Sequence, residues 1–204
     1  MPEPVATRRL FLALPLQPEA LAALSSLLER LQAAARFTPA RVNWVQPRNL
    51  HLTLHFLGSV PEEKVEPLRL ALREVARRAP PFELRLHGLG YFPSIRQPKV
   101  LWVGVPSPPR ELGKLVASLG QAVQATGLEL QHQDFHAHVT LGRFPALKGT
   151  GAFASTVAGQ AKYSTTRSQA DRVVLFESVL APEGPTYVPL AEAALEGGAP
   201  FLGV

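Results

Sequence analysis

Two short stretches of the chain carry the same pattern, His-x-Thr-Leu. Residues 51–58 read HLTLHFLG and residues 138–143 read HVTLGR, so the two histidines lie 87 positions apart (138 − 51 = 87). Histidine titrates near neutral pH, and a pair of histidines can therefore act as one proton acceptor and one proton donor. Threonine hydroxyls donate hydrogen bonds to an oxyanion without adding charge. These residue types suit an in-line displacement at phosphorus, and that chemistry requires no metal.

Alternating polarity predicts that each pattern lies on a β-strand. The polar faces are expected to carry His51, Thr53 and His55 in the first strand and His136, His138 and Thr140 in the second. The opposite faces are expected to be apolar, with Leu52, Leu54 and Phe56 in the first strand and Ala137, Val139 and Leu141 in the second. Two polar faces turned toward one cleft would place two histidines and two threonines around one small ligand.

A metal site is an alternative interpretation of the same histidines. Four candidate ligands lie within seven residues: His132, Asp134, His136 and His138. His51 and His55 have the i, i+4 spacing of a zinc helix, but their segment alternates like a strand and no glutamate follows His51. Neither a G-x-S-x-G nucleophile elbow nor the glycine spacing of a phosphate-binding loop is present. We therefore expect no metal and no cofactor.

Around the two patterns, the chain is predicted to alternate between strands and helices. Expected strands are 8–16, 41–45, 50–57, 82–89, 100–105, 136–144, 172–180 and 187–191. Expected helices are 18–35, 60–79 and 108–126, the second starting at a capping box of Ser59 and Glu62. The glycine-rich stretch 148–160 is expected to be a surface loop. This order favours an α+β fold with antiparallel or mixed sheets and outer helices. We expect residues 1–204 to form one domain with two lobes.

Composition restricts the class of protein. The chain has 204 residues, 46% of them hydrophobic, and a formal net charge of +5. There is no cysteine, which excludes disulfides and a thiol nucleophile and favours the cytoplasm. No apolar run approaches the roughly 20 residues of a membrane span. RRLFLALPLQ from Arg8 begins like a secretion signal, but its apolar part is short and no small-residue cleavage site follows, so a buried first strand is expected.

The longer sequence around both patterns resembles a known family. HLTLHFLG, HVTLGR, the opening RLFLAL and the run GLGYFPSIRQPKVLWVGV from Gly88 are similar to the bacterial and archaeal RNA 2′,3′-cyclic phosphodiesterases. These enzymes were first named 2′-5′ RNA ligases and belong to the two-histidine phosphoesterase superfamily. The likeness runs from Arg8 to about Tyr187, where FESVLAPEGPTY resembles the family's last strands. It implies a bilobal fold, with two antiparallel β-sheets and helices on the outer faces around a central cleft.

The resemblance also implies roles for individual residues. His51 matches the proton donor and His138 the proton acceptor, while Thr53, Thr140 and Arg143 match the residues that hold the phosphate. Strand alternation places the side chain of Arg143 on the opposite side from Thr140. Arg143 therefore reaches the cleft only if the strand ends or bulges at Gly142, which a glycine permits.

The implied activity is hydrolysis of an RNA 2′,3′-cyclic phosphate end to a 2′-phosphate, with 2′-5′ joining as a possible side reaction. The implied partner is RNA or an oligonucleotide with that end, and we expect a cytoplasmic monomer. The alternatives are a phosphodiesterase for other 2′-5′-linked or cyclic nucleotides, a non-catalytic protein that binds RNA ends, and a metal-dependent hydrolase. Candidates to stack on a base are Trp44, Tyr91, Phe92 and Trp102.

Overall fold

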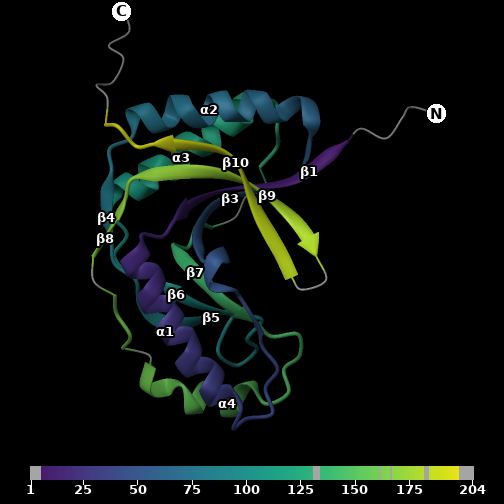
Figure 1. Ribbon diagram of the computed structural model, residues 1–204, viewed down its shortest axis with the longest axis vertical. Coiled ribbons are helices and arrows are strands. Elements are labelled where there is room, and N and C mark those ends of the chain that lie inside the picture. Colours follow the sequence, from purple (N-terminus) through teal and green to yellow (C-terminus); the bar gives the residue numbers. More distant parts are fainter. Residues whose placement is uncertain (1–5, 131–133, 161, 166, 182–183, 198–204) are drawn as a thin grey trace, which may run out of the picture.

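The strands of both sequence patterns meet in the middle of a long antiparallel sheet (Figure 1). The computed structural model describes residues 6–130, 134–160, 162–165, 167–181 and 184–197. The strands are β1 Thr7–Pro15, β2 Asn43–Trp44, β3 His51–Pro61, β4 Phe82–Leu84, β5 His87–Phe92, β6 Val100–Gly104, β7 His138–Arg143, β8 Ser168–Ala170, β9 Arg172–Ala181 and β10 Gly184–Ala194. The helices are α1 Pro18–Ala35, α2 Val65–Arg78, α3 Arg110–Ala125 and α4 Thr150–Thr156, with 3-10 turns at Pro47–Asn49, Glu62–Lys64 and Ala158–Gln160.

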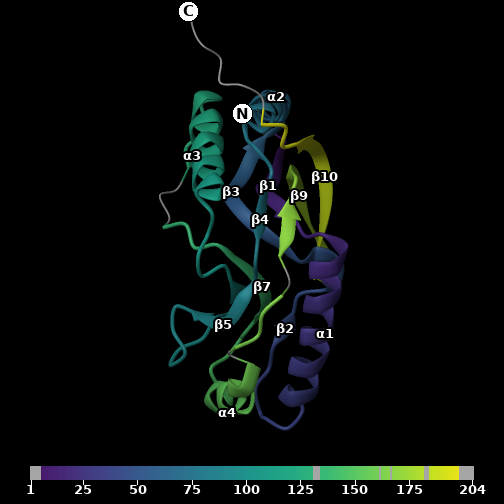
Figure 2. The same cartoon turned by 90° about the vertical axis from the view of Figure 1, so that its left-hand side faces the viewer.

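The sheet has two halves that join between β3 and β7. Its strand order is β10-β9-β1-β3-β7-β6-β5, with β2 on β7, while β4 and β8 form a separate two-stranded sheet. Every pair is antiparallel, and Leu52 of β3 pairs with Val139 of β7 at the join. Helices α2 and α3 lie beside the half that contains β1 and β3, while α1 and α4 lie beside the other half (Figures 1 and 2). The predicted α+β class with antiparallel sheets and outer helices is confirmed.

Both halves of the chain contribute to both halves of the sheet. Strands β5 and β6 from the first half of the sequence extend the sheet from β7, whereas β9 from the second half pairs with β1 and is followed by β10. The apolar faces of the strands and helices form one core cluster that runs through both lobes. Leu52, Val139 and Leu141, each next to a site residue, are fully buried in it. Burial of the apolar faces therefore turns the polar faces of β3 and β7 away from the core.

Helix α2 begins later than the sequence predicted. Strand β3 extends through Ser59 to Pro61 because β1 pairs with it as far as Thr7. Glu62 does not form the predicted capping box, and its carboxylate instead binds Arg8, with Nε and Oε2 2.6 Å apart. The prediction of a helix from residue 60 is wrong because cross-strand pairing and this ion pair outweigh the local capping signal.

Three other local predictions are wrong in part. Residues 82–89 form parts of two strands in different sheets, β4 and β5. The stretch 148–160 contains α4 and a 3-10 turn, and its Phe153 is fully buried against Trp44 and Phe144. Strand β7 begins at His138 and not at residue 136. In contrast, α1 has the predicted bounds Pro18–Ala35. Within the described residues no helix is long and apolar enough to cross a membrane.

Candidate active site

His51 opens β3, directly after the 3-10 turn that ends at Asn49. Its Nδ1 lies 2.8 Å from the carbonyl oxygen of Asn49, and its Nε2 lies 2.9 Å from Oγ1 of Thr53. A carbonyl oxygen only accepts hydrogen bonds, so Nδ1 carries the proton of the neutral ring, and Nε2 accepts a hydrogen bond from the threonine hydroxyl. The ring packs 4.9 Å from Phe11 and edge-on to Tyr187 at 5.2 Å. Burial lowers the pKa of His51 to about 4, opposed by the Asn49 carbonyl and assisted by the charge of His138.

His138 opens β7 with the same local arrangement. Its Nδ1 lies 2.6 Å from the carbonyl oxygen of His136, two residues earlier, as Asn49 is two residues before His51. The ring is edge-on to Phe92, with the ring centroids 5.0 Å apart. Burial lowers the pKa of His138, against the effect of the His136 carbonyl, and the charges of His136 and Arg143 lower it further. The Nδ1–H tautomer leaves the Nε2 lone pair as the basic atom of this ring.

The backbone register brings the two patterns together. Leu52 and Val139 are a cross-strand pair, and each directly follows a histidine. An antiparallel register centred on this pair sets His51 across from Thr140 and Thr53 across from His138. The two histidines then stand on a diagonal, where residues lie roughly 7–8 Å apart. One polar face therefore carries both histidines and both threonines.

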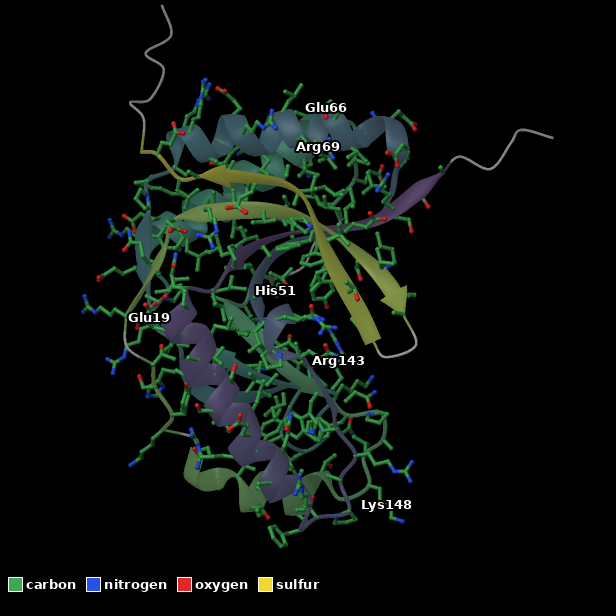
Figure 3. All side chains as sticks on the ribbon, in the orientation of Figure 1. Glu19, His51, Glu66, Arg69, Arg143 and Lys148 are labelled. Carbon is green, nitrogen blue, oxygen red and sulfur yellow. The ribbon has the colours of Figure 1, made fainter. Side chains whose placement is uncertain are left out.

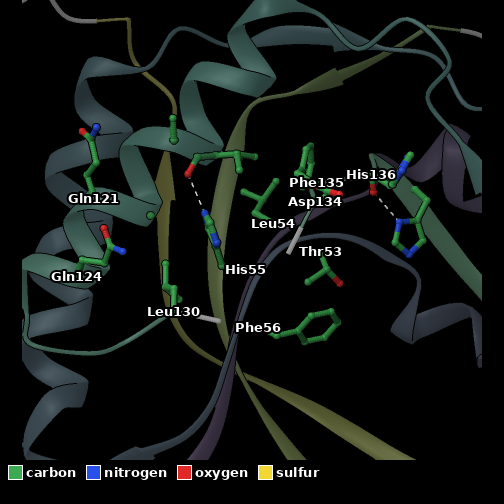
Figure 4. A pocket seen from close by; sticks show the side chains of 14 residues that line it. Thr53, Leu54, His55, Phe56, Gln121, Gln124, Leu130, Asp134, Phe135 and His136 are labelled. Carbon is green, nitrogen blue, oxygen red and sulfur yellow. Dashed lines mark hydrogen bonds between the residues drawn. The ribbon is translucent and has the colours of Figure 1, made fainter. Parts of the chain in front are cut away.

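Two adjoining cavities open on this face. The cavity that we name the His51 cavity has a volume of about 460 Å³. Its lining includes Arg9, Phe11, Asn49, His51, Thr53, Phe56, Thr140, Arg143, Ser178 and Tyr187. The second, the His138 cavity, has a volume of about 510 Å³ (Figure 4). Its lining includes His138, residues of α3 and of the segment that leads into β7, and Thr53, Leu54, His55 and Phe56 of β3. Thr53 and Phe56 line both cavities and so stand at their boundary.

A bulge in β7 directs Arg143 into the His51 cavity. Trp102 of β6 pairs with Thr140, but the preceding Leu101 pairs with Gly142, so Leu141 has no partner and the alternation of faces shifts by one residue. Thr140 and Arg143 consequently line the same cavity. A Cβ on Gly142 would lie 2.7 Å from Cγ1 of Val42 and 3.3 Å from the indole of Trp44, so β2 packs on β7 only over a glycine. Figure 3 shows Arg143 and His51 in the middle of the molecule.

A similar irregularity in β3 overturns the predicted face of Phe56, whereas His55 lines the His138 cavity together with Thr53. Between β1 and β3 the register shifts after the pair Leu12–His55. The Nε2 atom of His55 lies 2.7 Å from the carbonyl oxygen of Val116, so this ring is anchored to α3 (Figure 4). The side chain of Phe56, predicted to be apolar core, is 58% exposed and lines both cavities with Thr53. Strict alternation therefore holds only up to His55, because the register irregularity in β3 turns Phe56 outward.

The candidate metal ligands do not gather as the alternative interpretation requires. His55 bonds to α3, whereas His51 bonds to Asn49 and Thr53. His132 lies outside the described residues, while His55, Asp134, His136 and His138 all line the His138 cavity. In the described ranges there is no group of three or more histidine, cysteine or acidic residues placed to hold a metal ion.

Several residues of the site were not predicted from the sequence. Asn49 is buried, and its Nδ2 donates to the carbonyl oxygen of Pro185 at 2.7 Å, which ties the turn before His51 to the β9–β10 hairpin. Tyr187 of that hairpin packs on His51, and burial raises its pKa. Arg9 of β1 lines the same cavity. These residues come from distant parts of the chain, and only the spacing of Asn49 before His51 could have suggested one of them.

The four aromatic residues predicted to stack on a base divide into two pairs. The ring of Phe92 lies 5.0 Å from both His138 and Trp102, so these two aromatic residues surround the second histidine. The ring of Trp44 instead packs on Phe153, and Tyr91 packs near Phe144 on the α4 side. Phe92 and Trp102 are therefore the pair near the site.

An antiparallel fold of two lobes, with one His-x-Thr pair from each lobe on a shared face, defines this protein as a phosphoesterase. The chain belongs to the LigT-like phosphoesterase family, whose model matches it twice, over residues 14–102 and 103–187. Each match contains one His-x-Thr-Leu pattern. The resemblance found in the sequence is confirmed.

Relatives and solved structures agree with this assignment. The RNA 2′,3′-cyclic phosphodiesterase of Thermotoga maritima is 30% identical over 190 residues, which cover 93% of this chain and 97% of the relative. That of Methanothermobacter thermautotrophicus is 31% identical over 160 residues, 78% of this chain and 86% of the relative. The structure of TT0787 from Thermus thermophilus aligns with a TM-score of 0.74 at 29% identity, covering 94% of this chain and all of that one. Escherichia coli LigT complexed with 3′-AMP aligns with a TM-score of 0.70 at 28% identity, covering 93% and 99%.

Proposed function

We propose that the protein hydrolyses the 2′,3′-cyclic phosphate at an RNA end to a 2′-phosphate, with His51 and His138 exchanging protons with the reacting oxygens. The observation that carries the proposal is the Leu52–Val139 pair, which sets both histidines on one face with Thr53 and Thr140 between them. Relatives that match most of the chain bear the name RNA 2′,3′-cyclic phosphodiesterase. Arg9 and Arg143 in the His51 cavity suit an anionic RNA end.

The reaction follows from the position of each group. The nonbridging phosphate oxygens lie among Thr53, Thr140 and Arg143, which donate hydrogen bonds to the growing negative charge. The Nε2 atom of His138 removes a proton from water, and the water oxygen bonds to phosphorus. The bond between phosphorus and O3′ breaks on the opposite side, and His51 gives O3′ a proton. The product carries a 2′-phosphate and a free 3′-hydroxyl.

Protonation of His51 depends on the substrate. With a pKa of about 4, the ring is neutral at pH 7. A bound phosphate places negative charge beside it, which favours the imidazolium and raises its pKa. Once Nε2 carries a proton it no longer accepts from Thr53, and the threonine hydroxyl can donate to the phosphate instead. Substrate binding thus favours the protonated His51 that can act as the proton donor, and it frees the Thr53 hydroxyl to bind the phosphate.

We also propose a domain organisation, an oligomeric state and a compartment for the enzyme. Both lobes supply site residues, so residues 1–204 act as a single domain and one copy of the chain holds a full set of proposed site residues. A cysteine-free chain suits a cytoplasmic monomer, which is the state we propose.

The test is a product analysis with three variants. The protein is incubated in excess chelator with an oligonucleotide that ends in a 2′,3′-cyclic phosphate, and products are separated by chromatography. We expect the wild type to release only the 2′-phosphate end. His51→Ala and His138→Ala should each lower the rate by ~10²-fold or more, the low end for loss of a general acid or base.

His87→Ala is the matched control, because His87 is an exposed histidine on β5 that lines neither the His51 cavity nor the His138 cavity. Its rate should equal that of the wild type. A 3′-phosphate product, activity lost in chelator, or full activity in either motif variant would contradict the proposal. Parallel assays with a mononucleoside cyclic phosphate and a 2′-5′-linked dinucleotide separate the other phosphodiester substrates.

A further inference from the structure

Acidic residues are absent from long segments of the chain that build one lobe. Residues 30–61, 84–109 and 135–170 contain no aspartate or glutamate, but each contains arginines or lysines. These segments include β2, β5, β6, β7 and α4. In α2, by contrast, arginines form ion pairs with glutamates of the same helix. The lobe that contains β7 therefore presents a surface of positive potential.

Two exposed cations lie beside the end of β7, where Arg143 lines the His51 cavity. On one side β2 pairs with β7 through Asn43 and Arg143, and Arg41 comes two residues before Asn43. On the other side lies Lys99, whose carbonyl oxygen accepts a hydrogen bond from the N–H of Phe144 at 2.9 Å. Both cations are thus held next to Arg143 by backbone pairing.

A third exposed cation, Lys148, lies on the turn that follows β7. The next residue, Gly149, packs on the backbone of Ala40, and a Cβ on this glycine would lie 2.5 Å from the Ala40 nitrogen. The turn that carries Lys148 is therefore in contact with the segment that carries Arg41. Figure 3 shows Lys148 below Arg143, both on the right-hand side of α1.

We name Arg41, Lys99 and Lys148 the β7-end cations. All three are exposed, and in the part of the chain that the structure describes none of them forms an ion pair. They line neither the His51 cavity nor the His138 cavity, so they lie outside the proposed catalytic machinery. Cations of this kind, next to a cavity for an anionic end, suit further phosphates of the same ligand.

An exposed aromatic ring lies at the same end of the lobe. Phe37 is 87% exposed, more than any other large apolar side chain in the described residues. It follows α1 and comes three residues before Ala40, on which Gly149 packs. Cations that follow a backbone, together with a ring on which a base can stack, are the usual means of binding a single-stranded nucleic acid. An acidic polypeptide would use the cations but has no base for this ring.

We propose that the β7-end cations and Phe37 bind the body of the RNA chain that leads to the cyclic end. This inference rests on the proposed function, in which the terminal ribose and its cyclic phosphate occupy the His51 cavity. The preceding nucleotides leave this cavity past Arg143 and cross the end of the β7 lobe. The protein therefore prefers a polynucleotide to a mononucleoside cyclic phosphate, and its contacts with the backbone do not depend on base sequence.

The first test is a binding measurement without turnover. A fluorescently labelled single-stranded RNA with a 2′-phosphate end is titrated with the full-length protein at several salt concentrations, and anisotropy gives Kd. In the triple variant Arg41→Gln, Lys99→Gln, Lys148→Gln, the slope of log Kd against log salt concentration should fall by about 2, since each lost phosphate contact removes about 0.7. At about 0.1 M salt, binding should weaken by roughly tenfold or more.

Matched controls remove the same groups elsewhere. The triple variant Arg73→Gln, Arg77→Gln, Arg78→Gln takes the same charge from exposed arginines of α2 and should keep the wild-type slope. Phe37→Ala should weaken binding by about fivefold or more with an unchanged slope, as expected for a lost base stack. Leu70→Ala removes another exposed apolar side chain, also from α2, and should have no effect.

The second test is hydrolysis of a long and a minimal substrate. The variant of the β7-end cations should lower kcat/KM for a cyclic-phosphate-ended oligonucleotide by roughly tenfold or more at about 0.1 M salt. Its kcat/KM for a mononucleoside 2′,3′-cyclic phosphate should equal that of the wild type, because this substrate has no preceding nucleotides. Wild-type activity on the minimal substrate also shows that the variant is folded.

The outcomes separate this inference from the proposed function. An equal loss of RNA binding in the α2 control, an equal loss of activity on the mononucleoside, or polyglutamate that binds as tightly as RNA of the same charge overturns the RNA surface and leaves the hydrolase intact. RNA binding that depends on the β7-end cations, without hydrolysis of either substrate, supports the surface and overturns the proposed function.

Discussion

Leu52 of β3 pairs with Val139 of β7, and each of these buried residues directly follows a motif histidine. This pair joins the two halves of the sheet and brings the two His-x-Thr patterns side by side on one face. Because the pairing is made by the backbone, the distance between the histidines depends on the register of two strands and not on a flexible loop. The repeat in the sequence thus has a structural counterpart in the antiparallel pairing of β3 with β7.

Gly142 should resist substitution, whereas Gly113 should not. In Gly142→Ala the new Cβ overlaps Val42, which forces β2 away from β7 and moves the adjacent Arg143. We expect a loss of about 1–3 kcal/mol in the free energy of unfolding, typical of overpacking, together with lower activity. The control is Gly113→Ala in α3, where a Cβ meets nothing within 4 Å. There, urea denaturation should show a gain of about 0.5–1 kcal/mol.

Arg143 should contribute to catalysis by donating hydrogen bonds to the phosphate. Arg143→Ala is expected to lower kcat/KM by ~10²-fold, the usual effect of losing one donor to a developing oxyanion. Arg143→Lys should recover only part of the loss, because an ammonium group lacks the planar fork. Steady-state kinetics check this, with Arg110→Ala at the exposed start of α3 as control. Equal rates for Arg143→Ala and the control would show that the guanidinium does not contact the substrate.

The pH profile should differ between free and bound enzyme. Burial lowers the pKa of both histidines, that of His51 to about 4. Since kcat/KM reports on the free enzyme, its bell-shaped profile should peak on the acid side of pH 6.5. The bound phosphate raises both pKa values, so both limbs of the kcat profile should lie at higher pH. Rate measurements from pH 4 to 9 test this, and coincident profiles would show that the phosphate does not face the histidines.

Stability should fall in acid because of His51. Its pKa is about 4 when folded and near 6.5 when unfolded, so the unfolded chain binds the proton more readily between these values. The free energy of unfolding should therefore drop as pH falls from 6.5 to 4, by up to about 3 kcal/mol from this residue, and change little above pH 6.5. Denaturation of wild type and His51→Gln at several pH values measures the difference. An equally steep fall in the variant would assign the effect to other groups.

Asn49 should stabilise the site through its hydrogen bond to the β9–β10 hairpin. In Asn49→Ala the carbonyl of Pro185 loses its donor, which loosens the hairpin that carries Tyr187. We expect a loss of about 1–2 kcal/mol in the free energy of unfolding, the cost of leaving a partner unsatisfied. Asn43→Ala, an exposed asparagine in β2, is the control and should stay within about 0.5 kcal/mol of wild type. Chemical denaturation measures both variants, and equal free energies of unfolding would show that the hydrogen bond from Asn49 to Pro185 does not stabilise the fold.

Much of the fold could be predicted because its signals are local. The leucine spacing of α1 determines a helix by itself, and its bounds are those predicted. The alternation around His138 likewise predicts a strand with Val139 and Leu141 in the core. The helix start at residue 60 and the loop at 148–160 were predicted wrongly, since an ion pair from Arg8 and the burial of Phe153 depend on distant segments.

For the site itself, the sequence alone determined the residue types and their repetition: two histidines and two threonines at matching positions of two strands. Only the tertiary structure decided which side chains share a cavity. A bulge turns Arg143 toward Thr140, another turns Phe56 outward while His55 binds α3, and the hairpin brings Tyr187 onto His51. The physical reason is that polarity alternates along one chain, whereas bulges and register arise from pairing between chain segments that lie far apart in the sequence.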